Sequence, residues 1–206
     1  MTGVFITIEG IEGAGKSTAL SYLERYFQAR GRSCLLTREP GGTVLGEQVR
    51  RWLLDPESSI DPSAETLLMF AARAQHLATV IRPALNAGKV VICDRFTDAT
   101  YAYQGEARGL GQERIAVLER WTQAQLRPDL TLLLDLPVAE SALRLERRRS
   151  VPDRIEREGP SFFERVRAAY LARAAQEPQR IRCIDARQRP EDVESALQHL
   201  LSTAGF

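Results

Sequence analysis

Lysine is almost absent from this sequence: Lys16 and Lys89 are the only two among 28 lysine and arginine residues. A lysine ammonium is a compact point charge that suits a phosphate, whereas arginine offers a planar fork of donors. One of the two lysines, Lys16, lies inside a glycine-rich segment, where such a point charge could meet a phosphate. The scarcity also argues against a GTPase of the common type, because neither lysine follows the asparagine of an Asn-Lys-x-Asp motif.

A large excess of one charge is also missing. The formal net charge is +1, although 27% of the residues are charged. A protein held to nucleic acid or to an anionic membrane by its overall field would carry a clear positive excess. We therefore expect neither partner, and any anion that the protein binds must be held by local groups.

Cysteines are few and long apolar runs are lacking. Cys34, Cys93 and Cys183 form no CxxC pattern, which favours a reducing compartment over a disulfide framework. The longest apolar run, residues 4–8, is far too short to span a bilayer, and the first residues lack the basic start of a signal peptide. We expect a cytoplasmic protein, and 206 residues fit one domain of ordinary size.

Short apolar runs alternate with long amphipathic stretches along the whole chain. Continuously apolar strands that alternate with helices are typical of a parallel sheet covered on both faces. The sequence therefore predicts an α/β fold with a five-stranded parallel sheet. The expected strands are 4–8, 33–37, 90–94, 130–135 and 181–185, and the main expected helices are 16–30, 63–86, 100–126 with an interruption near 105–111, 162–176 and 190–201.

A glycine-rich segment joins the first expected strand to the first expected helix. It matches the pattern G-x-x-x-x-G-K-[ST], in which backbone N–H groups face phosphates, the lysine reaches the β and γ oxygens and the hydroxyl holds Mg²⁺. The segment predicts binding of a nucleoside triphosphate, with ATP as the phosphoryl donor. The expected ATP-binding residues of this loop are Gly10, Ile11, Glu12, Gly13, Ala14, Gly15, Lys16, Ser17 and Thr18.

Charged residues follow three of the other expected strands. Arg38 comes after one strand, Asp94 and Arg95 come at the end of another, and Asp135 ends a third. The carboxyl ends of parallel strands meet at one edge of the sheet, where open α/β folds bind their ligands. Arginines there can hold a phosphate through paired hydrogen bonds, and Asp94 can hold Mg²⁺ through water, with Asp135 as the alternative.

The long expected helix carries a possible base-binding face. Phe70 and Arg73 are three residues apart, and Met69 and Arg73 are four apart, so an apolar side chain and a guanidinium share one face. This arrangement suits a nucleobase, although an ordinary core residue beside a surface arginine is the commoner case for such a pair.

Taken together, these motifs resemble those of bacterial thymidylate kinases in order and spacing over essentially the whole chain. The resemblance implies the nucleoside monophosphate kinase fold in one P-loop domain, residues 1–206, with a lid at about 144–160. It implies transfer of the γ-phosphoryl group of ATP to dTMP, giving dTDP and ADP for dTTP synthesis, with Mg²⁺ and in a homodimer. The motifs are Gly10 to Ser17, Arg38 to Thr43, Phe70 to Arg73, Asp94 to Phe96, Tyr101 to Gln104 and Arg127 to Leu130.

The resemblance also implies roles for residues around the acceptor. Arg38 and Arg95 would hold the dTMP phosphate, Arg73 would meet the thymine, and Thr100 and Gln104 would border the base. Tyr103 resembles the family tyrosine beside C2′ that disfavours ribose, and Glu12 resembles the loop acid near the acceptor's sugar.

Two positions depart from the family pattern. The stacking phenylalanine usually sits four residues before the arginine, where this chain has Met69, so either Met69 replaces the ring or Phe70 contacts the base. Ala99 stands where a serine is common.

The expected catalysis needs cations more than it needs a base. The acceptor is already an anion, so positioning and charge neutralisation by Lys16, Mg²⁺, Arg95 and a mobile arginine should dominate. The phosphate loop itself contains no arginine. The lid must supply one, with Arg149 as our first choice and Arg154 as the second, whereas Arg144 and Arg147 are interpreted as a solvated helix face.

Two other functions remain open from the residues alone. The first is a kinase for another nucleoside monophosphate or a small metabolite. The second is a nucleotide-binding switch without turnover, although the arginines expected at the acceptor edge argue against a protein with no second phosphate to hold.

Overall fold

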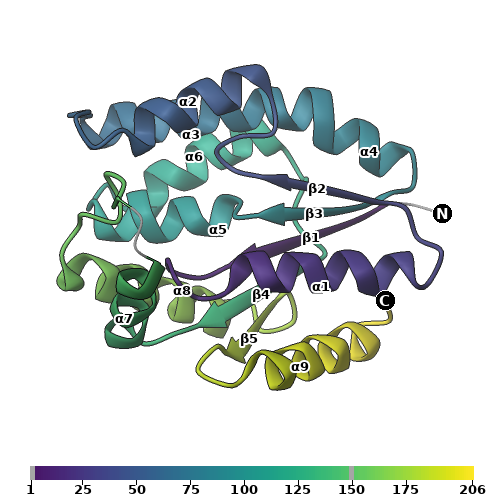
Figure 1. Ribbon diagram of the computed structural model, residues 1–206. Helices are drawn as coiled ribbons and strands as arrows, with labels where there is room; N and C mark the ends of the chain where they lie inside the picture. Colours follow the sequence, from purple (N-terminus) through teal and green to yellow (C-terminus); the bar gives the residue numbers. More distant parts are fainter. Residues whose placement is uncertain (1–2, 149–150) are drawn as a thin grey trace.

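The computed structural model describes residues 3–148 and 151–206, and in them it shows a parallel sheet between two layers of helices (Figure 1). The strand order is β2-β3-β1-β4-β5, and every neighbouring pair runs parallel. The strands are β1 (Val4–Glu9), β2 (Cys34–Arg38), β3 (Val90–Asp94), β4 (Leu130–Asp135) and β5 (Ile181–Asp185). The predicted fold class and the five predicted strands are confirmed.

Helices connect the strands in the order that the sequence predicts. They are α1 (Lys16–Gln28), α2 (Val44–Leu54), α3 (Pro62–His76), α4 (Arg82–Asn86), α5 (Thr97–Thr100), α6 (Gln112–Gln123), α7 (Val138–Arg148), α8 (Pro160–Gln176) and α9 (Pro190–Thr203). Two π-helical turns continue these helices. The turn η1 (Leu77–Ile81) joins α3 to α4, and η2 (Tyr101–Ala107) follows α5 and leads toward α6.

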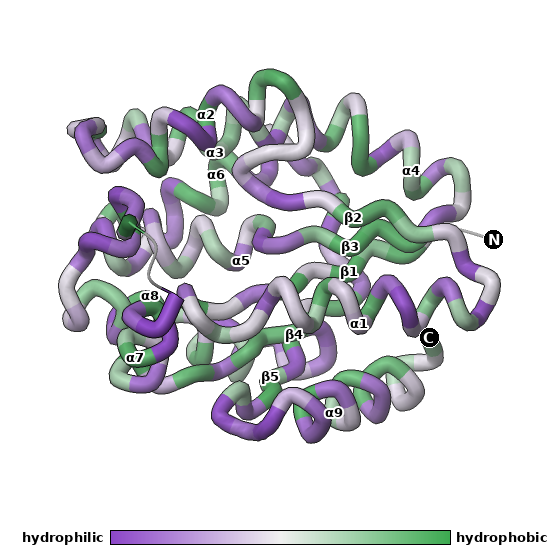
Figure 2. Tube along the Cα trace, viewed as in Figure 1, coloured by the Kyte–Doolittle hydropathy of each residue, from purple (hydrophilic) through white to green (hydrophobic). Residues whose placement is uncertain are grey.

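The core lies on both faces of the sheet because the strand side chains alternate between them. Ile6 and Ile8 pack in one buried cluster with Leu23 and Phe27 of α1. Phe5 points the other way and packs with Leu77 and the residues around it. Figure 2 shows the hydrophobic residues concentrated along the strands, with hydrophilic residues on the outer helices. Such two-sided burial explains why the strands read as continuous apolar runs.

The carboxyl ends of the strands lie together at one edge of the sheet. Register aligns Ile8 of β1 with Asp94 of β3, and Arg38 of β2 with the same aspartate. The loop between β1 and α1 and the helix α7 both lie at this end, at the left in Figure 1. Over the described residues, no helix is both long and apolar enough to cross a membrane.

Candidate active site

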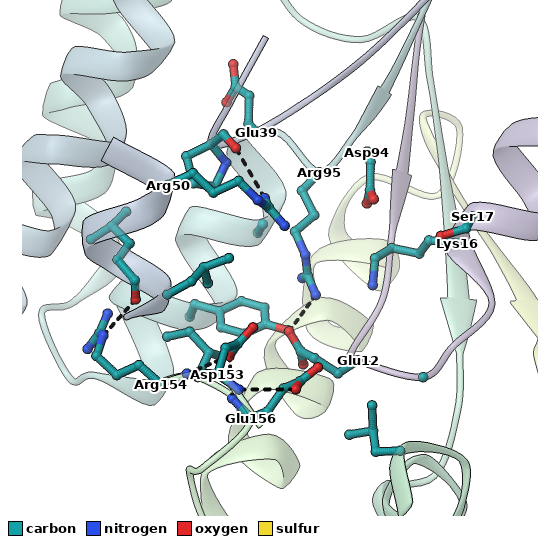
Figure 3. A pocket seen from close by; sticks show the side chains of 18 of the residues that line it. Glu12, Lys16, Ser17, Glu39, Arg50, Asp94, Arg95, Asp153, Arg154 and Glu156 are labelled. Atoms are coloured by element: carbon teal, nitrogen blue, oxygen red, sulfur yellow. Dashed lines mark hydrogen bonds and ion pairs between the residues drawn. The ribbon is translucent and has the colours of Figure 1, made fainter. Parts of the chain in front are cut away.

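A cavity of about 730 Å³ opens at this edge of the sheet. Its walls come from the phosphate loop, α2, α3, the segment after β3, η2, α7 and the turns at residues 151–156. Figure 3 shows charged side chains from these elements pointing into the space. The labelled residues of that view are Glu12, Lys16, Ser17, Glu39, Arg50, Asp94, Arg95, Asp153, Arg154 and Glu156.

Glycines give the phosphate loop its close turn. Gly10 has φ of 138°, and a Cβ on it would lie 2.5 Å from the carbonyl oxygen of Leu134. Lys16 folds back over the loop and donates to the carbonyl oxygens of Gly10 and Ile11 at 3.1 and 3.0 Å. Burial, and then the charge of Arg95, lower the pKa of Lys16 from 10.5 to about 8. A phosphate bound here would raise the pKa of Lys16 again and keep its ammonium group protonated.

Asp94 and Asp135, the two alternatives for a metal, lie in different surroundings. Asp94 lines the cavity together with Ser17, and its Oδ1 is buried without a hydrogen-bond partner in the described structure. Asp135 is held in an ion pair by Arg167, with bonds of 2.7 and 2.9 Å. The unsatisfied oxygen of Asp94, in the same cavity as the loop hydroxyl, fits a Mg²⁺ ion held largely by phosphate oxygens and water.

Arg95 is fixed in an unusual backbone conformation at the end of β3. Its φ of 66° is left-handed, which is uncommon outside glycine and often marks a functional site. The side chain donates to Glu12 at 2.7 Å and to the hydroxyl of Tyr170 at 3.3 Å. Tyr103 donates to the same Glu12 carboxylate at 2.8 Å. Arg95, Glu12 and Tyr103, predicted from separate motifs, are thus one bonded group.

A second arginine at this end of the cavity is one that the sequence analysis missed. Arg50 of α2 lines the cavity and donates to the carbonyl oxygen of Pro40 at 3.2 Å. Burial, and then the charge of Arg38, lower the pKa of Arg50. Arg38 itself is half-exposed, pairs with Glu47 at 2.9 Å and does not line the cavity. No local motif marks Arg50 in the sequence, because its place in the cavity depends on how α2 packs.

Helix α3 begins where it does because of a cap. The side chain of Asp61 accepts hydrogen bonds from the backbone N–H groups of Ser63 and Ala64, and Pro62 occupies the first helical position. This start places Met69 and Arg73, four residues apart, on the same face of the helix.

The structure separates the two candidates for base stacking. Met69 lines the cavity. Phe70 does not, and it packs in a buried cluster with Tyr101 and Ile115. Its ring also lies 4.8 Å from the guanidinium carbon of Arg73. Met69 is therefore the side chain available to a base in this cavity.

Arg73 is fully buried beneath the cavity wall. It donates to Glu39 at 2.6 Å and to Thr100 at 2.9 Å, and Glu39 lines the cavity. Its Nη1 has no hydrogen-bond partner among the described residues. A buried donor without an acceptor costs free energy, so this atom suits a carbonyl oxygen brought by a ligand. Gln104, also predicted to border the base, lines the cavity, whereas Arg73 and Thr100 are fully buried and are not among the residues that line it.

The structure describes only some of the arginines of the predicted lid. Arg149, our first choice for the mobile cation, lies outside the described residues. Arg154 lines the cavity, donates to the carbonyl oxygen of Leu53 at 2.7 Å and pairs with Glu65. It therefore lies on the side of α2 and α3, away from the phosphate loop.

The interpretation of Arg144 as a solvated residue was wrong. It lines the cavity and donates to the carbonyl oxygens of Gly13 and Ala186 at 3.2 and 2.7 Å. The side chain thereby ties α7 to the phosphate loop and to the loop after β5. Arg147, interpreted in the same way, is exposed.

The fold and the cavity together define a class of protein. A phosphate loop at the carboxyl edge of a five-stranded parallel sheet faces, across one cavity, a second set of arginines and a pocket beside α3. Two phosphate-binding regions that face each other are the arrangement of a nucleoside monophosphate kinase.

Comparison with known proteins narrows the class. The family model described as thymidylate kinase matches residues 8–197. A thymidylate kinase from Pseudomonas savastanoi pv. phaseolicola is 58% identical over 202 residues, which cover 98% of this chain and 96% of that protein. One from Alkalilimnicola ehrlichii is 56% identical over 203 residues, with 98% and 94% covered. The crystal structure of thymidylate kinase from Ehrlichia chaffeensis superposes with a TM-score of 0.78 at 31% identity, covering 98% of this chain and 100% of that one. The chain belongs to the thymidylate kinase family.

Proposed function

We propose that this chain transfers the γ-phosphoryl group of ATP to dTMP and releases dTDP and ADP. The observation that carries the proposal is that the phosphate loop, Arg95 after β3 and Arg50 of α2 all line the same cavity. The family membership supports the same reaction.

The phosphate loop would hold the donor. Lys16 can leave its two loop carbonyls for the β and γ oxygens of ATP, while Ser17 and Asp94 would hold Mg²⁺. The bound ion would supply charge neutralisation between the β and γ oxygens. Arg144, bonded to Gly13 and to the loop after β5, would fix the position of the phosphate loop itself.

Arg95 and Arg50 would hold the acceptor phosphate. The acceptor oxygen is already anionic, so no side chain needs to remove a proton from it. The barrier comes mainly from repulsion between two anionic groups, which cations on both sides of the transferring group reduce. Arg38 would join them after leaving Glu47.

The pocket beside α3 would hold the thymidine. Met69 would contact the face of the base, Gln104 and Thr100 would border it, and Nη1 of Arg73 would donate to a base carbonyl. Tyr103, fixed by its bond to Glu12, would stand beside C2′ and disfavour a ribose hydroxyl. We also propose that the enzyme works as a homodimer in the cytoplasm, where its three unpaired cysteines would stay reduced.

The acceptor preference is the direct test. ADP formation is measured with dTMP, dUMP, dGMP, CMP, AMP and shikimate as acceptors at fixed ATP and Mg²⁺. We expect dTMP to give the highest kcat/KM. A higher value with another acceptor would identify a different kinase on this fold, and ATP binding without ADP release on any acceptor would identify a switch.

A further inference from the structure

Glu65 of α3 is a buried carboxylate that the proposed reaction does not use. Its side chain is 2% exposed and lines the wall of the cavity. Oε1 accepts a hydrogen bond from Nε2 of Gln104 at 2.7 Å, and Oε2 pairs with Nη2 of Arg154. Nε of Arg108 lies farther away, 3.5 Å from Oε1, and Arg108 has a closer partner in Glu158.

The bond to Glu65 determines how the Gln104 amide is turned. An ionised carboxylate can only accept hydrogen bonds, so it must receive the NH₂ group of the amide and not its carbonyl oxygen. The two polar atoms of an amide lie on opposite sides of its carbon. With Nε2 held by Glu65, Oε1 of Gln104 is the atom left to a ligand in the cavity that Gln104 lines.

An acceptor at this position matches one kind of pyrimidine. Thymine and uracil present an N3–H donor beside a C4 carbonyl, whereas cytosine presents an N3 acceptor beside a C4 amino group. Oε1 of Gln104 can accept from N3–H, and the unpartnered Nη1 of Arg73 can donate to the C4 carbonyl. Cytosine would bring an acceptor against an acceptor and leave buried groups unpaired.

We propose that Glu65 is a positioning residue that holds Gln104 with its carbonyl toward the base, and so favours dTMP over dCMP. The inference rests on the proposed function. Glu65 does not contact the substrate in this proposal. It acts by fixing the orientation of the Gln104 amide.

Replacing Glu65 by Gln should reverse that orientation. Arg154 can only donate, so the carbonyl oxygen of the new amide should face Arg154 and its NH₂ group should face Gln104. Gln104 would then turn its own oxygen toward position 65 and its NH₂ group toward the base. We expect the ratio of kcat/KM for dTMP to that for dCMP to fall at least about 10-fold, mainly through a higher KM for dTMP.

A double-mutant cycle separates orientation from general damage. In the Gln104→Ala background, Glu65→Gln should change the dTMP to dCMP ratio by less than about twofold, because the residue through which Glu65 acts is gone. Glu158→Gln, which removes the closer partner of Arg108, is the matched control and should keep the wild-type ratio. Glu65→Asp, still only an acceptor, should keep the preference for dTMP even if KM rises.

Two results would overturn the inference. The first is a folded Glu65→Gln variant whose dTMP to dCMP ratio of kcat/KM equals that of the wild type. The second is a Glu65→Gln substitution that lowers this ratio equally in the wild-type and the Gln104→Ala backgrounds. If Glu65→Gln does not fold, the same cycle is run with Glu65→Ala, which frees the amide to take either orientation. Wild-type enzyme without activity on dTMP would instead contradict the proposed function, so the two failures are distinguishable.

Discussion

Arg73 combines a structural ion pair with a proposed role in recognising the base. The side chain is fully buried, is paired with Glu39, and has no hydrogen-bond partner for Nη1 among the described residues. Removing one partner of a buried ion pair leaves a charge in a low-dielectric interior, which costs about 3 to 5 kcal/mol. Stability and acceptor binding should therefore both respond to changes at this position.

We predict that Arg73→Ala raises the KM for dTMP at least about 10-fold with a smaller change in kcat, because the contact with the base serves binding more than transfer. Steady-state kinetics with dTMP checks this, and urea unfolding measures the loss of stability. Arg73→Lys is the matched control for charge, since it keeps a cation near Glu39 but loses the planar fork. An unchanged KM for dTMP in the Ala variant would remove Arg73 from the base site.

Glu9, at the end of β1, gives the enzyme a pH dependence. Burial, and then the charge of Asp98, raise its pKa from 4.5 to about 7, although Tyr170 and the backbone of Phe96 donate to it. The folded state therefore binds this proton more tightly than the unfolded state. Its contribution to stability must fall as the pH rises from about 4.5 to about 7.

We predict that Glu9→Gln gains stability relative to the wild type between pH 5 and pH 8, by up to about 3 kcal/mol. The amide has no proton to lose, and it can still accept from the backbone of Phe96 and meet the hydroxyl of Tyr170. Urea unfolding of both proteins at pH 5, 6, 7 and 8 gives the difference directly. A difference that stays constant over this range would show that Glu9 titrates alike in both states.

At the scale of elements, the sequence predicts the strands and the phosphate loop well and the helix interruptions less well. The expected long helix at 63–86 is present, but it contains the π-helical turn η1, and η2 occupies part of the predicted interruption near 105–111. A π-turn shifts the side-chain period by one residue over a short stretch. Hydrophobic periodicity is averaged over longer windows and does not resolve such a shift.

The candidate site is predictable where a motif is local and unpredictable where it depends on distant pairs. Lys16 and Arg95 come from contiguous motifs. Arg50 was missed because it lies on a helix whose orientation relative to the cavity is set by tertiary packing. Arg144 was misread for the same reason, since its carbonyl partners at Gly13 and Ala186 are far away in the sequence.

The predicted lid, at about 144–160, carries a prediction that belongs to the scale of elements. We expect Arg149→Ala to lower kcat at least about 100-fold with little change in the KM for dTMP, because the phosphate loop has no arginine of its own near the γ-phosphate. Arg147→Ala, two residues earlier on the exposed side of α7, is the control and should keep kcat. A near wild-type kcat in the Arg149 variant would transfer the role to Arg154 or to another cation.

At the scale of the whole molecule, α3 and α6 carry exposed apolar side chains. Leu67 of α3 is 56% exposed, and Val117 and Trp121 of α6 are 54% and 81% exposed. Val117 and Trp121 are four residues apart and so share one side of their helix. Large apolar side chains exposed on two helices that pack together make this surface our candidate for a dimer interface.

We predict a dimer in solution that Trp121→Glu converts to monomers, because a charge would replace a large apolar side chain in the contact. Sedimentation equilibrium of both proteins measures this. Leu143→Glu, at a 53% exposed position of α7, is the control and should remain dimeric. A wild-type monomer, or a Trp121→Glu dimer of unchanged affinity, would place the interface elsewhere or exclude it.

The pairing of Arg95 with Glu12 and of Arg38 with Glu47 has a further consequence for the binding of anions. Each cation already carries its own counter-ion, supplied by the chain. A small anion from the surroundings must displace a tethered carboxylate to bind, and tethering gives that carboxylate a high effective concentration. Chloride and free phosphate should therefore compete poorly, while a nucleotide held elsewhere in the cavity can bring its phosphate to both cations at once and displace the two carboxylates together.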